Sequence, residues 1–75
     1  MTEPVDREIQ RLLRLPWTIT VETSPEGDRL LRVREIPSAV GCGATDAEAI
    51  ADLWASLEAS LRAYVHFGDA VPLPA

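Results

Sequence analysis

Apolar residues near the start of the chain recur with the spacing of a helix. They fall at positions i, i+4, i+7 and i+8, which share one helical face: Val5, Ile9, Leu12 and Leu13. Pro4 fits the first turn of such a helix, and Pro16 ends it because the residue before a proline disfavours the α conformation. The pattern predicts a short amphipathic helix over residues 4–14.

A longer helix is predicted over residues 46–67. Thr45 and Glu48 have the spacing of a capping box, and Gly68 suits the end of a helix. The apolar residues follow at spacings of three and four: Ile50, Leu53, Trp54, Leu57, Leu61 and Tyr64. The side chains that we expect to face a sheet are Ile50, Leu53, Leu57 and Leu61.

Between the two helices the period changes to two. Over residues 17–23 apolar side chains alternate with polar ones, as in a strand with one buried face: Trp17, Ile19 and Val21. A turn at residues 24–28, which contains proline and glycine, leads into a second strand at residues 29–36. We place Leu31 and Val33 of this hairpin on the inner face. Arg32 and Arg34 are expected on the outer face, where they pair with Glu22 across the strands.

The small residues around 40–44 predict a third strand, and the prolines within residues 69–75 require an extended tail. The strands form a β-meander over residues 17–44. The expected fold class is therefore α+β, as one domain over residues 1–75. A small antiparallel sheet of three or four strands is covered by one long helix, with a short N-terminal helix added.

The composition excludes some classes of function. The formal net charge is −5 and every basic residue is arginine, which argues against direct nucleic acid binding and suits a basic protein partner. No stretch is apolar enough for a signal peptide or a membrane span, so a cytoplasmic protein is expected.

Assembly is expected because a chain of 75 residues builds only a small core. Cys42 is the only cysteine and His66 the only histidine, so neither a disulfide framework nor a metal-ligand set is available. We expect no cofactor. A homodimer or higher homo-oligomer, joined through a sheet edge or the first helix, is the expected source of further stability.

Candidate chemistry in the sequence is sparse. Asp46, Glu48 and Asp52 suggest the carboxylates of a metal-dependent nuclease, but acidic residues at a helix start are explained by capping and the helix dipole. Cys42 and His66 suggest a thiol–imidazole pair, but a buried structural cysteine and a surface histidine are the simpler interpretation. We therefore expect no enzymatic activity.

The two tryptophans, Trp17 and Trp54, suit either partner anchors or the core. We assign both to the core, Trp54 more firmly.

Four short motifs together resemble the HicB-type antitoxins of bacterial toxin–antitoxin systems. They are Leu15-Pro16-Trp17-Thr18-Ile19, Glu35-Ile36-Pro37, Gly43-Ala44-Thr45-Asp46-Ala47-Glu48-Ala49 and Gly68-Asp69-Ala70-Val71-Pro72-Leu73-Pro74. They cover roughly residues 12–75 in the family's order and separation. One departure is Pro37-Ser38-Ala39, where the family often has Pro-Gly-Cys, so Cys42 is not the family cysteine.

The resemblance implies a partial RNase H-like fold that binds and blocks a HicA-type toxin, a small basic ribonuclease that cuts messenger RNA. Many relatives continue into a DNA-binding domain, which we do not expect here because the sequence ends at Ala75. The candidate partner-binding residues lie in and after the hairpin: Glu22, Glu26, Asp28, Arg32, Arg34 and Glu35. An interaction or regulatory domain of the same fold without a toxin partner is the alternative.

Overall fold

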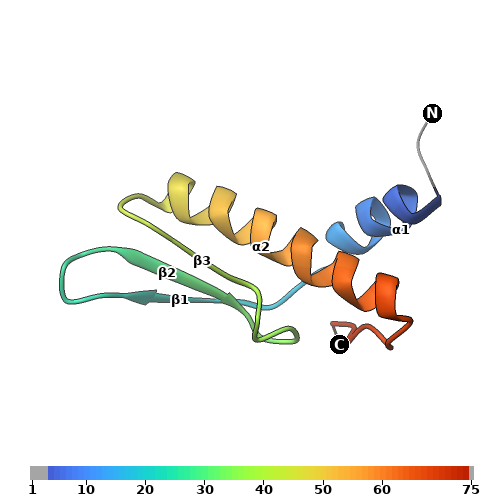
Figure 1. The fold of residues 1–75 in the computed structure, drawn as a ribbon. Helices are drawn as coiled ribbons and strands as arrows, with labels where there is room; N and C mark the ends of the chain where they lie inside the picture. Colours follow the sequence, from blue (N-terminus) through green and yellow to red (C-terminus); the bar gives the residue numbers. More distant parts are fainter. Residues whose placement is uncertain (1–3, 75) are drawn as a thin grey trace.

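The computed structural model describes residues 4–74, and these form a three-stranded antiparallel sheet with two helices. The elements follow one another as α1 (Pro4–Leu13), β1 (Ile19–Thr23), β2 (Arg29–Val33), β3 (Val40–Gly43) and α2 (Asp46–Phe67). The strands lie in the order β1-β2-β3 and α2 runs along one face of the sheet (Figure 1). The α+β class is confirmed, with three strands.

Helix α2 begins and ends where the sequence predicts. The Thr45 hydroxyl accepts a hydrogen bond from the Glu48 N–H, which closes the N-terminus. Gly68 adopts a φ of 71°, in the left-handed region that favours glycine, and the Asp69 N–H then bonds the Tyr64 carbonyl at 3.0 Å. The chain therefore turns back sharply, and the tail doubles back beneath the last turns of α2 (Figure 1).

Two glycines let α2 lie directly on β3. A Cβ atom on Gly41 would meet the backbone nitrogen of Leu53 and lie 2.6 Å from the Ala49 carbonyl oxygen. One on Gly43 would lie 2.8 Å from the Ala49 nitrogen. Because α2 could not come this close to β3 if either position carried a side chain, the two glycines determine that α2 lies over β3.

The core lies between α2 and the β2–β3 half of the sheet. Its buried apolar residues are Ile9, Leu12, Trp17, Leu31, Val33, Ile36, Ala39, Ala49, Leu53, Leu57 and Leu61. Helix α1 joins this core through Ile9 and Leu12, and the Trp17 indole N–H donates to the Leu12 carbonyl at 2.9 Å. An ion pair of 2.8 Å between Asp6 and Arg62 also ties α1 to α2.

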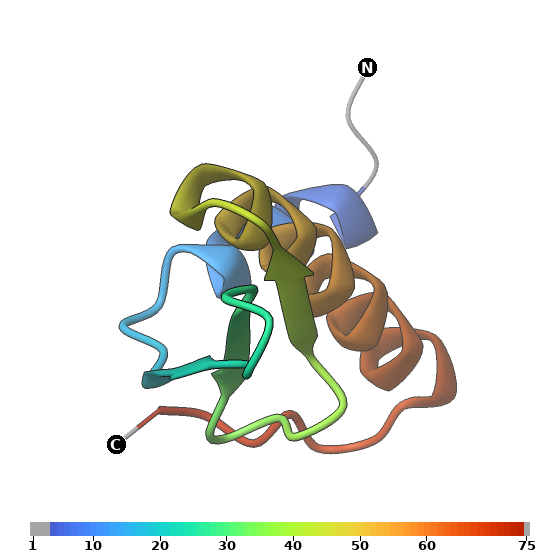
Figure 2. The same ribbon diagram turned by 90° about the vertical axis from the view of Figure 1, so that its left-hand side faces the viewer.

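Two core assignments from the sequence, those of Ile50 and Trp54, are wrong, and that of Trp17 is confirmed. Ile50 is 46% exposed and Trp54 is 39% exposed, whereas Trp17 is only 8% exposed. The reason is that α2 sits over β3 and β2 and leaves β1 uncovered (Figure 2). The flank of α2 that carries Ile50 and Trp54 therefore faces solvent, as do the apolar side chains of β1.

The pairing of the strands corrects two further expectations, and the end of β2 corrects a third. Glu22 lies opposite Leu30, not opposite an arginine, and no ion pair among residues 4–74 joins Glu22 to Arg32 or Arg34. Cys42, expected to be buried, is exposed because its side chain is on the sheet face away from α2. The strand β2 also ends at Val33, short of the predicted residue 36, because the chain bends there.

Neither helix in the described part of the chain combines the length and apolar character needed to cross a bilayer.

Candidate functional site

The outer edge of β3 is closed by polar side chains of α2. The Glu48 carboxylate accepts from the Ala44 N–H at 3.0 Å, and the Asp52 carboxylate accepts from the Cys42 N–H at 2.9 Å. One turn further on, the Ser56 hydroxyl accepts from the N–H of Val40 at 3.1 Å. Four helical residues rise about 6 Å and two strand residues about 6.6 Å, so the two series stay in step along the edge.

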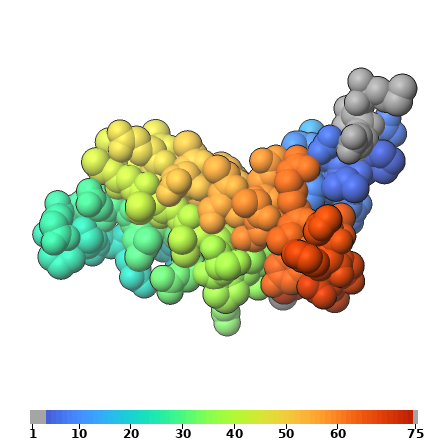
Figure 3. Space-filling model, viewed as in Figure 1, coloured from blue at the N-terminus to red at the C-terminus, as the bar shows by residue number. Residues whose placement is uncertain are grey.

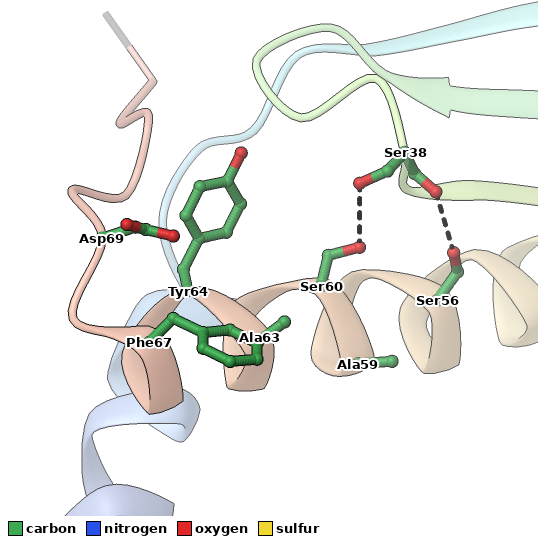
Figure 4. A pocket seen from close by; sticks show the side chains of 8 residues that line it. All are labelled: Ser38, Ser56, Ala59, Ser60, Ala63, Tyr64, Phe67 and Asp69. Carbon is green, nitrogen blue, oxygen red and sulfur yellow. Dashed lines mark hydrogen bonds between the residues drawn. The ribbon is translucent and has the colours of Figure 1, made fainter.

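This polar ladder, formed by Glu48, Asp52, Ser56 and Ser60, continues past the end of β3. The Ser60 and Ser38 hydroxyls lie 3.2 Å apart, and the Ser56 hydroxyl donates to the Ser38 carbonyl at 3.5 Å (Figure 4). Because unpaired edge groups invite strand addition, the ladder protects this side of the sheet.

The carboxylates weighed as nuclease ligands therefore have structural partners. Asp46 pairs with Arg29 at 3.0 Å, while Glu48 and Asp52 belong to the polar ladder. Within residues 4–74 no group of three or more histidine, cysteine, aspartate or glutamate side chains is arranged to hold a metal ion.

The proposed thiol–imidazole pair is also not brought together. The Cys42 backbone is held by Asp52 near the first turns of α2, whereas His66 is in the last turn. Fourteen residues of helix separate Asp52 from His66, which corresponds to about 21 Å.

A shallow hollow lies beside the C-terminal half of α2. Its lining combines hydroxyls, alanines, two aromatic rings and a carboxyl group: Ser38, Ser56, Ala59, Ser60, Ala63, Tyr64, Phe67 and Asp69 (Figure 4). The Ser38 and Ser60 hydroxyls already bond each other, and the Ser56 hydroxyl donates to the Ser38 carbonyl. Asp69 is the only carboxyl group in the lining. The hollow thus offers no converging set of catalytic groups.

Most of the predicted partner-binding carboxylates gather at one end of the molecule. Glu22, Glu26 and Asp28 are exposed on the hairpin, which projects beside the first turn of α2 (Figure 3). Asp46 and Glu48 at the start of α2 extend the same surface, and the sequence interpretation had set these two aside as capping residues. We call these five residues the acidic end.

The other predicted partner residues do not belong to the acidic end. Arg32 shares the sheet face away from α2 with Glu22, but it lies further from the hairpin turn, opposite Thr20 and Val40. Glu35 accepts from the Thr18 N–H at 3.0 Å at the far end of the hairpin. Hydrogen bonds from the Thr18 side chain and backbone lower the pKa of Glu35, so this carboxylate fixes the start of β1.

The arginines of α1 lie at the opposite end of the molecule. Arg7, Arg11 and Arg14 belong to this helix and its exit, and Arg11 is bonded to Glu8. The molecule measures 41 × 27 × 20 Å along its principal axes, so the acidic end and these arginines are well separated. Because Asp6 and Glu8 lie on the same helix as these arginines, negative charge dominates at the acidic end but is largely balanced at the α1 end.

An apolar groove, which sequence reasoning missed, lies between β1 and α2. It has a volume of about 320 Å³ and is lined by Ile19, Val21, Leu31, Asp46, Ile50 and Leu53. The signal that would have revealed it is the pair Gly41 and Gly43, since glycines in the third strand place the helix there and away from β1.

None of the protein-family models matches the chain, and no curated protein or solved structure matches it either.

Proposed function

We propose that this protein is a binding protein of the HicB-antitoxin kind, which neutralises a small basic HicA-type ribonuclease by covering its RNA-binding surface. The resemblance of four sequence motifs supplies the class of partner. The acidic end is the observation that carries the proposal, because its three hairpin carboxylates have no ion-pair partner among residues 4–74: Glu22, Glu26 and Asp28.

The chemistry of this surface suits such a partner. A ribonuclease that binds RNA presents cationic side chains spaced to meet phosphates, and exposed carboxylates on a projecting hairpin offer the same charge to those side chains. Opposite charges on the two surfaces raise the association rate and orient the encounter. In this interpretation the protein performs no chemistry and acts by occupying the surface that RNA would use.

The proposal is tested by expressing the product of the gene next to this protein's and measuring its association with this protein. Reversing Glu26 and Asp28 to arginine should slow association by about tenfold at 10 mM salt, and less at 150 mM, since the Debye length falls from about 30 Å to about 8 Å. The control reverses Glu8 and Asp69, which changes the net charge equally at the other end of the molecule.

Stopped-flow association rates for the two variants decide the outcome. Equal slowing by both variants would show that only net charge matters and would remove the acidic end from the proposal. Failure of the wild-type protein to bind the toxin at all would favour an interaction domain without a toxin partner.

A further inference from the structure

Within residues 4–74, the outer edge of β1 pairs with no other strand, in contrast to the edge of β3, whose N–H groups are bonded to α2. The Thr18 carbonyl accepts from the Arg34 N–H at 2.8 Å, and the Ser24 N–H donates to the Asp28 carbonyl at 2.8 Å. Because hydrogen-bonded pairs alternate in an antiparallel ladder, the even-numbered residues of β1 bond to β2. The backbone N–H and C=O groups that point outward therefore belong to Ile19, Val21 and Thr23.

The same strand supplies the apolar floor of the groove beside α2. Ile19 and Val21 lie opposite Val33 and Leu31, so their side chains are on the α2 face, yet Val21 is 62% exposed. The facing wall carries Ile50, and Trp54 follows it one helical turn later on the same side. A strand added at β1 would thus satisfy the outward backbone groups and cover apolar side chains together.

We propose that a second copy of this chain occupies this edge, with the two β1 strands antiparallel about a two-fold axis at Val21. This register pairs the whole strand: Val21 faces its own copy, and Ile19 faces Thr23 of the second copy. Directly opposed residues share a face in an antiparallel pair, so both α2 helices lie on the same side of a six-stranded sheet. The two apolar grooves then adjoin across the axis.

Charges on the opposite sheet face favour a second copy over an unrelated strand. In this register Thr20 faces Glu22 of the second copy, and Thr20 is itself paired with Arg32. Arg32 and the second copy's Glu22 are therefore two strand spacings apart, about 10 Å between Cα atoms, with only a small threonine between them. A long arginine side chain spans that interval, and the two-fold axis creates the contact twice.

Neither charge is used within one chain. The ion pairs among residues 4–74 include neither Glu22 nor Arg32. The register also places no like charges directly opposite each other, because Glu22 faces a threonine. The surface is thus complementary to itself, as an isologous interface requires.

The closed β3 edge limits assembly to two copies. Once the β1 edges are joined, the remaining edges of the sheet are the two β3 strands, whose N–H groups are bonded to α2 by the polar ladder. Further strand addition would have to displace the α2 side chains from these N–H groups, so we expect the assembly to stop at a dimer.

Sedimentation equilibrium of the full chain at micromolar concentration tests the assembly. We expect a dimer for the wild type and a monomer for Val21→Lys, which places two ammonium groups against each other at the axis. Phe67→Lys is the control, because Phe67 is 73% exposed but lies at the end of α2, and it should remain dimeric. Val21 is outside the core, so circular dichroism of the variant should match that of the wild type.

A charge exchange tests the register independently of the apolar contact. Glu22→Arg and Arg32→Glu should each raise the dimer dissociation constant by about tenfold, through two surface ion pairs per dimer. The double variant should return within about threefold of the wild type. The proposal does not depend on the toxin. Of the acidic end only Glu22 lies at the proposed interface, because Glu26 and Asp28 are in the turn beyond β1.

Three results would overturn the inference. They are a monomeric wild type, a Val21→Lys variant that remains dimeric, and a dimer that is dissociated by Phe67→Lys. Additive losses in the charge-exchange double variant would overturn the register at Val21.

Discussion

Replacing Leu57 by alanine tests whether α2 is held by burial against the sheet. Leu57 is fully buried, at 0% exposure, in the middle of the core-facing stripe of α2. Deleting such a side chain costs about 2.7–5.0 kcal/mol, depending on how far the surroundings relax. Because α2 packs directly on the β3 backbone at Gly41 and Gly43, it cannot move in to fill the cavity that the substitution leaves. We therefore expect the free energy of unfolding to fall by about 3–4 kcal/mol.

That loss is large for this chain. At about 0.05–0.15 kcal/mol per residue, a 75-residue domain has roughly 4–11 kcal/mol of stability in total. Urea denaturation followed by circular dichroism, at one fixed protein concentration, measures the change. Leu73→Ala is the matched control, because it removes the same atoms from a side chain that is 60% exposed. Equal midpoints for the two variants would refute the assigned core.

Two further predictions concern the backbone of the sheet. Gly41→Ala should destabilise the fold by about 2 kcal/mol or more, since its Cβ would lie 2.6 Å from the Ala49 carbonyl oxygen and force α2 to move, and urea denaturation measures this loss. An unchanged midpoint would contradict the close packing. Glu35 has a lowered pKa in the folded state, so its contribution is present above the unfolded value of about 4.5 and is lost as pH falls through the folded pKa. Glu35→Gln should therefore flatten the fall in thermal stability between pH 5 and pH 3, and parallel melting curves for both proteins would count against it.

The helices were predictable because their signals are local. The capping residue Thr45 and the terminal Gly68 act on the turns next to them, and each is seen in the role that its position predicts. The alternation in the hairpin likewise identifies which side chains share a face, since the strand period is two.

How far α2 extends across the sheet was not predictable from the alternation of apolar and polar residues. Period-two alternation places Ile19 and Val21 on the α2 face, but it does not state how far the helix reaches across the sheet. That limit follows from long-range packing of Gly41 against Ala49 and Leu53, which the apolar pattern does not encode. The misplacement of Ile50 and Trp54 has this single cause.

The candidate site was predicted only in part, because some of its residues are brought together by the fold and not by the local sequence. Glu26 and Asp28 were predicted as acidic residues near the hairpin, whereas the contribution of Asp46 comes from its position in space beside the hairpin, where it pairs with Arg29. Glu35 was assigned to the same surface from its charge alone, and its bond to the Thr18 N–H places it at the other end of the hairpin.

The most direct measurement is to express the product of the neighbouring gene and titrate its ribonuclease activity with this protein. We predict that cleavage of messenger RNA falls linearly and stops at one chain of this protein per toxin, and that Glu26→Arg with Asp28→Arg requires an excess to reach the same inhibition. Ribonuclease activity that persists at every ratio of the two proteins would contradict the proposed function.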